Sequence, residues 1–145
     1  MPGAIGCVQA DSTVRHSEGA RGPRDLRVLY HYHSQQFDTG SPRVLATLID
    51  SLDRRVYEPL FLANGDGPLI GELRRRNVAI VEQPTTVITY RHPIASLRAL
   101  AAKRRLLRAL KIDLVHVNDF GWNLDVVLAA ALIGIPVVLH VHNPV

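Results

Sequence analysis

The segment that indicates the fold most clearly is DLVHVNDFGWNLDVVLAAALIGIPVVLHV, residues 113–141. It opens and closes with short runs rich in Val and Leu, which predict strands at Leu114–Val117 and Val137–Val141. Between them, an apolar segment predicts a helix over Leu124–Ile133, because Asn123 can cap its start and the Gly and Pro that follow can end it. Both strands are almost continuously apolar, which is typical of a parallel sheet covered by helices on both faces.

The same alternation of strand and helix extends back to Leu26 and indicates an α/β protein. Three more strands are expected at Arg27–His31, Pro59–Ala63 and Val78–Val81. Three more helices are expected, with Pro42, Pro68 and Pro93 in their first turns. The second of these helices should end near Asn77 and the third near Lys111. Right-handed crossovers between five strands give a doubly wound, Rossmann-like parallel sheet in three α/β/α layers. We expect one domain over residues 26–145 and a disordered tail over residues 1–25, where Gly, Ser, Pro and charge occur without apolar periodicity.

Composition excludes several protein classes. The 145 residues are 47% apolar and 21% charged, which is ordinary for one soluble domain. Cys7 is the single cysteine, so no internal disulfide can form, and the seven histidines have no cysteine partners for a structural zinc site. The longest apolar run, Val126–Leu139, falls short of the ~20 residues that a membrane span needs, and the first residues show no secretory signal. We expect a cytoplasmic protein without a bound metal.

The positive charge is concentrated in two helical patches, one at Arg74–Arg76 and a larger one on the third helix. The whole chain carries 17 Lys and Arg against 13 Asp and Glu, a net charge of +4, which is too small to indicate a nucleic-acid partner. At about 100° per residue, five cations of this helix fall within about 140° of one another: Arg98, Arg104, Arg105, Arg108 and Lys111. The opposite side is apolar, interrupted by Lys103. Two interpretations remain open: a solvated face in an Arg-rich protein, and a reversible contact that makes the protein peripheral on the anionic inner face of the membrane.

The position of polar residues predicts a ligand site at one edge of the sheet. In open parallel sheets, ligands bind outside the carboxyl ends of the strands. Four of the five expected strand ends carry groups that suit a polyhydroxylated or phosphorylated ligand: His31–Ser34, Asn64–Gly67, Asn118–Asp119 and His142–Asn143. Ordinary surface loops are also polar, so this pattern alone assigns no function. His116 lies inside a strand and is interpreted as a core residue.

Nucleotide-binding motifs are weak or absent. The glycines of Gly65–Gly71 do not have the spacing of the dinucleotide fingerprint, and Pro68 removes an amide that could face a pyrophosphate. No P-loop lysine motif occurs.

Several segments, in this order and spacing, resemble the N-terminal domain of GT-B fold glycosyltransferases of the family 4 type. Thr39–Leu45 occupies the place of the glycine-rich loop that opens the first helix of that family, with Gly40 and Arg43 matching. The segments Gly67–Val78, Ile112–Asn118 and Ala130–Asn143 resemble the second helix with the third strand, the fourth strand, and the end of that domain.

The resemblance implies transfer of a sugar from a nucleoside-diphosphate donor to an acceptor hydroxyl, by positioning and charge stabilisation and without a metal or other cofactor. It implies His142 as the catalytic residue, since His142 matches a histidine that contacts the sugar or acceptor; His140, one pleat earlier, is the alternative. The substrate-binding residues that it implies are Gly40, Ser41, Asn118, Asp119 and Asn143.

The resemblance also implies a partner domain that holds the nucleotide sugar. Such a domain is a second Rossmann-like unit, and the sequence given ends directly after the fifth strand. We therefore expect the acceptor-side half of a transferase, inactive alone, whose acceptor is a glycan, a lipid or a small molecule. Two other interpretations stay open: a non-catalytic domain that binds a sugar or a partner, and an unrelated Rossmann-like binder of small molecules.

Overall fold

The computed structural model describes residues 26–118 and 124–141. The elements are, in chain order, β1 (Leu26–His31), α1 (Gly40–Asp50), β2 (Tyr57–Ala63), α2 (Pro68–Arg75), β3 (Ala79–Glu82), α3 (Pro93–Ala109), β4 (Leu114–Asn118), α4 (Leu124–Ala131) and β5 (Val137–His140). These strands form one parallel sheet in the order β3-β2-β1-β4-β5. The tail expected over residues 1–25, together with Asp119, His142 and Asn143, lies outside the described residues.

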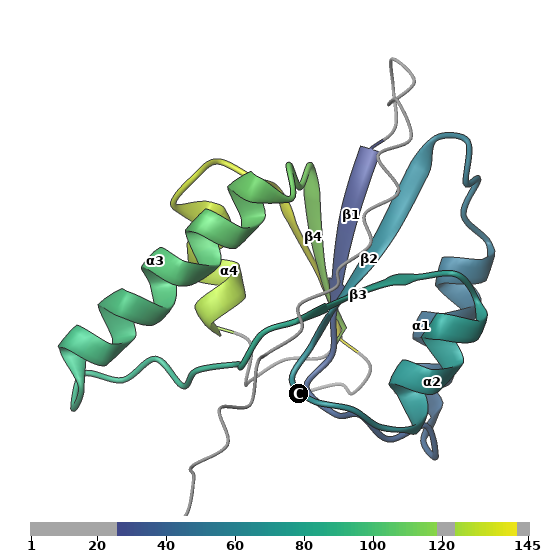
Figure 1. Cartoon of the computed structure of the whole chain (residues 1–145), viewed down its shortest axis with the longest axis horizontal. Coiled ribbons are helices and arrows are strands. Elements are labelled where there is room, and N and C mark those ends of the chain that lie inside the picture. Colours follow the sequence, from purple (N-terminus) through teal and green to yellow (C-terminus); the bar gives the residue numbers. More distant parts are fainter. Residues whose placement is uncertain (1–25, 119–123, 142–145) are drawn as a thin grey trace, which may run out of the picture.

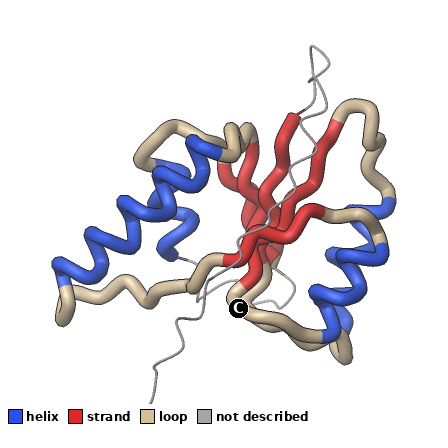
Figure 2. The backbone as a smooth tube through the Cα atoms, in the orientation of Figure 1, coloured by secondary structure: helices blue, strands red, loops and turns tan. Residues whose placement is uncertain are grey.

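Helices cover both faces of the sheet. The helices α1 and α2 lie on one side and α3 and α4 on the other (Figure 1), and the strands form the middle layer between them (Figure 2). Consecutive residues of β1 alternate between the two faces, since Val28 and Tyr30 join the core under α1 and α2 while Leu29 joins the core under α3 and α4. The doubly wound, three-layer fold that the sequence predicts is confirmed.

Three helices end in the same backbone motif. A residue with positive φ follows the last helical turn in each case: Asn77 (φ 55°), Lys111 (φ 51°) and Gly134 (φ 75°). The next residue is apolar and donates its amide to the carbonyl five residues earlier, in the pairs Val78–Leu73 at 3.1 Å, Ile112–Leu107 at 3.0 Å and Ile135–Ala130 at 3.0 Å. The expected helix end near Asn77 is confirmed. The third strand begins at Ala79 rather than Val78, because Val78 is buried in closing the helix.

The helix α3 has one buried face and one solvent face. Ser96, Lys103 and Leu107 are buried. Of the five cations predicted to share a face, Arg98, Arg105, Arg108 and Lys111 are exposed and Arg104 is half-buried. No helix in the described ranges is both long and apolar enough to cross a membrane.

Candidate functional site

The carboxyl end of β4 lies against the start of α1. Asn118 is the last residue of β4 and is fully buried. Its side-chain amide donates to the backbone carbonyl of Ser41 at 3.3 Å. Gly40 and Ser41 form the first turn of α1, the helix that follows β1, and β1 pairs with β4 in parallel. The structure therefore brings together Gly40, Ser41 and Asn118, three of the residues predicted from the sequence to bind substrate.

The first residue of α1, Gly40, faces solvent with free space around it. A Cβ atom added at Gly40 would meet no other atom within 4 Å, and Gly40 is exposed. Thr39, which precedes the helix, makes no side-chain capping hydrogen bond. Amides at a helix N-terminus favour negatively charged groups, although Pro42 contributes none. A ligand can therefore approach the backbone at Gly40 closely.

A second feature of the same edge is a hollow of about 290 Å³ where the loops after β1, β2 and β3 meet. It is lined by His33, Asn64, Thr85 and Val87. Asn64 shapes it through two hydrogen bonds: its side-chain oxygen accepts from the amide of Thr85 at 3.3 Å, and its carbonyl accepts from the side chain of Gln35 at 3.2 Å. The sequence places His33 and Asn64 at strand ends, but Thr85 and Val87 carry no motif and were not predicted.

Three histidines of the sheet serve its packing. His31 is fully buried, and its Nδ1 atom lies 2.9 Å from the carbonyl of Leu62. His116 is buried, with its ring centroid 5.1 Å from that of Tyr30 and stacked on His140 at 5.8 Å. These contacts agree with the interpretation of His116 as a core residue. They also hold the ring of His140, the alternative to His142, against the sheet.

A buried ion pair fixes the segment that follows β3. Lys103 of α3 is 2% exposed and Asp125 of α4 is fully buried, and their Nζ and Oδ2 atoms lie 3.7 Å apart. Lys103 also donates to the carbonyl of Pro84 at 3.1 Å, and Asp125 accepts from the amide of Thr86 at 3.0 Å. Burial lowers the pKa of Lys103, although the Asp125 carboxylate opposes this shift. The pair therefore ties the loop of the candidate site to both helices on one face.

No metal-binding cluster is formed within residues 26–118 and 124–141. No three His, Cys, Asp or Glu side chains in these ranges are grouped so that they could hold a metal ion.

Comparisons with known proteins give a family and a fold. The sequence profile of Glycosyltransferase Family 4 matches residues 39–145, whereas a search of curated proteins gives no match. Solved structures with the same fold include MurG of Acinetobacter baumannii, with a TM-score of 0.56 and 23% identity over 79% of this chain and 33% of that one. A glycosyltransferase from Rickettsia africae ESF-5 gives 0.60 and 15% over 79% and 29%. Anabaena Alr3699/HepE, in complex with UDP and glucose, gives 0.59 and 18% over 81% and 30%.

The chain thus spans about a third of the length of these solved structures. The family profile covers well over half of the chain, and the fold of the chain is similar to that of these solved structures. The chain belongs to Glycosyltransferase Family 4 and corresponds to the N-terminal domain of its GT-B fold.

Proposed function

We propose that this domain is the acceptor-side half of an enzyme that transfers a sugar from a nucleoside-diphosphate donor to a hydroxyl of a glycan, a lipid or a small molecule. The observation that carries the proposal is the contact between Asn118 and Ser41, which gathers family-matched residues at the carboxyl edge of the sheet. The hollow beside His33 and Asn64 lies at the ends of neighbouring strands and offers imidazole, amide and hydroxyl groups to a sugar.

The donor belongs to a second domain in this proposal. This chain covers only about a third of each related structure, and one of them is in complex with UDP and glucose. A nucleotide-sugar domain of comparable size would hold the donor diphosphate across a cleft from the edge described here. Transfer then depends on bringing two substrates together, and positioning supplies much of the rate.

The proposed roles follow the family resemblance. His142 accepts the proton of the acceptor hydroxyl, whose oxygen forms the new bond to the sugar while the nucleoside diphosphate leaves. Gly40 and Ser41 lie beside the donor phosphates or the acceptor, and Asn118, Asp119 and Asn143 hold hydroxyl groups. No metal or cofactor takes part, because amides and hydrogen bonds stabilise the leaving group.

We propose a cytoplasmic protein that contacts the anionic inner face of the membrane and no nucleic acid. The exposed cations on α3 and directly after it support this contact: Arg98, Arg105, Arg108 and Lys111, with Arg104 half-buried beside them. Each Lys or Arg close to an anionic leaflet contributes about 1 kcal/mol, so a few of them give reversible attachment.

A transfer assay tests the proposed function. We expect the 145-residue chain alone to give no product above the control without protein, for any nucleotide sugar, because the leaving diphosphate is neither held nor stabilised. The same chain fused to the nucleotide-sugar domain of a family 4 enzyme is expected to give product. Activity of the isolated, monomeric chain contradicts the two-domain proposal. A sugar that binds both proteins but is transferred by neither indicates the non-catalytic alternative.

A further inference from the structure

The loop after β3 is held by side chains at three consecutive backbone positions. The bonds are those of the Pro84 carbonyl with Lys103 at 3.1 Å, the Thr85 amide with Asn64 at 3.3 Å and the Thr86 amide with Asp125 at 3.0 Å. A loop fixed in this way presents its side chains in set positions. A ligand that binds there loses less free energy to ordering, so the arrangement favours a binding site.

Alternate side chains of this loop line two different hollows. Thr85 and Val87 line the smaller hollow, beside His33 and Asn64. Thr86, which lies between them in the chain, lines a larger hollow of about 770 Å³ at the start of α3. The loop therefore separates the two hollows.

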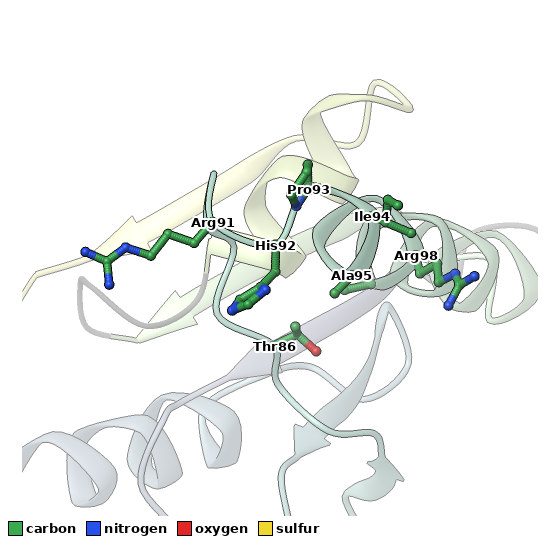
Figure 3. A pocket seen from close by; sticks show the side chains of 8 residues that line it. Thr86, Arg91, His92, Pro93, Ile94, Ala95 and Arg98 are labelled. Carbon is green, nitrogen blue, oxygen red and sulfur yellow. The ribbon is translucent and has the colours of Figure 1, made fainter.

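The two hollows differ in charge. Two cations line the larger one, where Arg91 and Arg98 extend to opposite sides while His92 points toward Thr86 (Figure 3). Among the described residues, none of the four that line the smaller hollow is Asp, Glu, Lys or Arg. An anionic group would lose its hydration in the smaller hollow without gaining a counter-charge.

The hydroxyl group of Thr85 is buried and unpaired. Its oxygen has no hydrogen-bond partner within residues 26–118 and 124–141. The same holds for the side-chain oxygens of Gln35, whose amide group donates to Asn64, and of Gln83, two residues earlier in the loop. Buried polar atoms without a partner are rare in folded proteins, because they have lost their hydration. Threonine hydroxyls occupy three staggered positions, so rotation about the Cα–Cβ bond can turn this oxygen toward a ligand in the smaller hollow.

Unpaired oxygens at this place favour a ligand that donates hydrogen bonds. The hydroxyl groups of a sugar donate as well as accept, whereas ionised phosphate and carboxylate groups mainly accept. Val87, which is 61% exposed, adds an apolar surface for the C–H groups of a ring. Ligand pockets usually measure about 300–1,000 Å³, so the 290 Å³ of the smaller hollow suits one sugar ring rather than a chain of sugars.

We propose that the smaller hollow binds one uncharged sugar ring of the acceptor and that the hydroxyl group of Thr85 determines this specificity. The inference rests on the proposed function and narrows its acceptor to a class. The ring held beside Thr85 carries neither a phosphate nor a carboxylate group.

Titration of the full ¹⁵N-labelled 145-residue chain tests the inference. The probes are the methyl glycosides of glucose, galactose, mannose and N-acetylglucosamine, together with their 6-phosphate and 6-carboxylate derivatives. We expect at least one neutral glycoside to shift the amide resonances of His33, Asn64 and Thr85 in a saturable way. Its charged derivatives should bind about tenfold more weakly, because they find no counter-charge there.

Thr85→Val separates a role in binding from a role in the fold. This variant replaces the hydroxyl group by a methyl group of similar size. It should bind the neutral glycoside about tenfold more weakly, since one hydrogen bond to the sugar is lost. It should not lower the midpoint of thermal unfolding, because the oxygen that it removes has no partner in the described fold.

Two further variants are the controls. Thr85→Ser keeps the hydroxyl group and should bind like the wild type. Thr86→Val makes the same exchange one residue later, in the side chain that lines the larger hollow, and should also bind like the wild type.

Three results overturn the inference and leave the proposed function in place. If Thr85→Val binds the glycoside like the wild type, its hydroxyl group does not contact the sugar. If Thr85→Val unfolds at a clearly lower temperature, the hydroxyl group stabilises the fold instead. If the charged derivatives bind as tightly as the neutral glycosides, the hollow does not select an uncharged ring.

The fused two-domain enzyme of the transfer assay distinguishes the inference from the proposed function. If it transfers sugar although no neutral glycoside shifts the three resonances, the inference alone is wrong. If the neutral glycosides bind as expected and the fused enzyme transfers nothing, the proposed function is wrong and the hollow binds a sugar without transfer.

Discussion

The variant Lys103→Met is expected to have a free energy of unfolding about 3–5 kcal/mol lower than that of the wild type, because it leaves the Asp125 carboxylate buried without its cation. The loss should also loosen Pro84, whose carbonyl accepts from Lys103. Chemical denaturation at neutral pH measures the first effect. Hydrogen exchange at the amide of Thr86, which donates to Asp125, measures the second.

The matched control is Lys111→Met, which changes the other lysine of the chain. Lys111 is exposed, so this substitution should stay within about 0.5 kcal/mol of the wild type. The double variant Lys103→Met/Asp125→Asn removes both charges and should recover part of the loss. If Lys103→Met and Lys111→Met have equal free energies of unfolding, the buried pair does not stabilise the loop after β3.

The same pair predicts a dependence of stability on pH. The pKa of Lys103 lies below its ordinary value of 10.5 in the folded protein, so the unfolded chain holds that proton to higher pH. The free energy of unfolding contributed by Lys103 therefore rises as the pH rises from the lowered pKa toward 10.5. Lys103→Met should lack this rise.

The variant Gly67→Ala is expected to lower the free energy of unfolding by about 1–3 kcal/mol through overpacking. The backbone of Gly67 is extended, so the cause is space and not conformation. A Cβ atom there would lie 2.7 Å from the Cβ atom of Gln35 and 2.9 Å from its carbonyl oxygen. That oxygen accepts a hydrogen bond from the amide of Leu69 at 2.9 Å, and the side chain of Gln35 donates to the carbonyl of Asn64. An added Cβ atom must therefore displace Gln35, and Asn64 with it.

Gly71→Ala is the control for this substitution. Gly71 lies inside α2, and an added Cβ atom would meet only the guanidinium of Arg75 at 3.9 Å. Alanine is the better helix residue, so this variant should gain about 0.5–1 kcal/mol. If Gly67→Ala is as stable as the wild type and leaves the amide resonance of Asn64 in place, the close approach between Gly67 and Gln35 does not shape the hollow.

The fold could be predicted from the sequence because its signals are local. The apolar runs at Leu114–Val117 and Val137–Val141, and helix starts at Pro68 and Pro93, needed no knowledge of distant contacts. Element ends were less certain: α1 begins at Gly40, two residues before the proline that marks it. A proline near a helix start needs no amide partner at several positions of the first turn, so it does not fix the first residue.

The candidate site could be predicted only in part. Gly40, Ser41 and Asn118 follow strands or open a helix, and the parallel topology alone brings them to one edge. The role of Lys103 could not be predicted from the sequence of its helix, where this residue only interrupts an apolar side. Its partner Asp125 lies on another helix. The positions of Thr85 and Val87 depend on that ion pair and on the hydrogen bond to Asn64. No local pattern in the loop predicts either of these two interactions.

Without the second domain, the carboxyl edge of this domain is expected to bind an acceptor and to leave the nucleoside-diphosphate donor unbound. The most direct measurement is a titration of the ¹⁵N-labelled chain, observed by nuclear magnetic resonance, with a panel of sugars and glycans and with a panel of nucleoside-diphosphate sugars. Gly40→Ala provides the site variant, since its added methyl group has open space in the fold but blocks a close ligand, and Gly71→Ala provides the control.

We expect a sugar acceptor to shift the amide resonances of Gly40, Ser41 and Asn64 in a saturable way, and we expect Gly40→Ala to weaken this response while Gly71→Ala preserves it. Nucleoside-diphosphate sugars should leave these resonances unchanged at concentrations that saturate complete enzymes of the family. Tight, saturable binding of a nucleoside-diphosphate sugar at this edge, with no response to any acceptor, would contradict the assignment of the domain to the acceptor side.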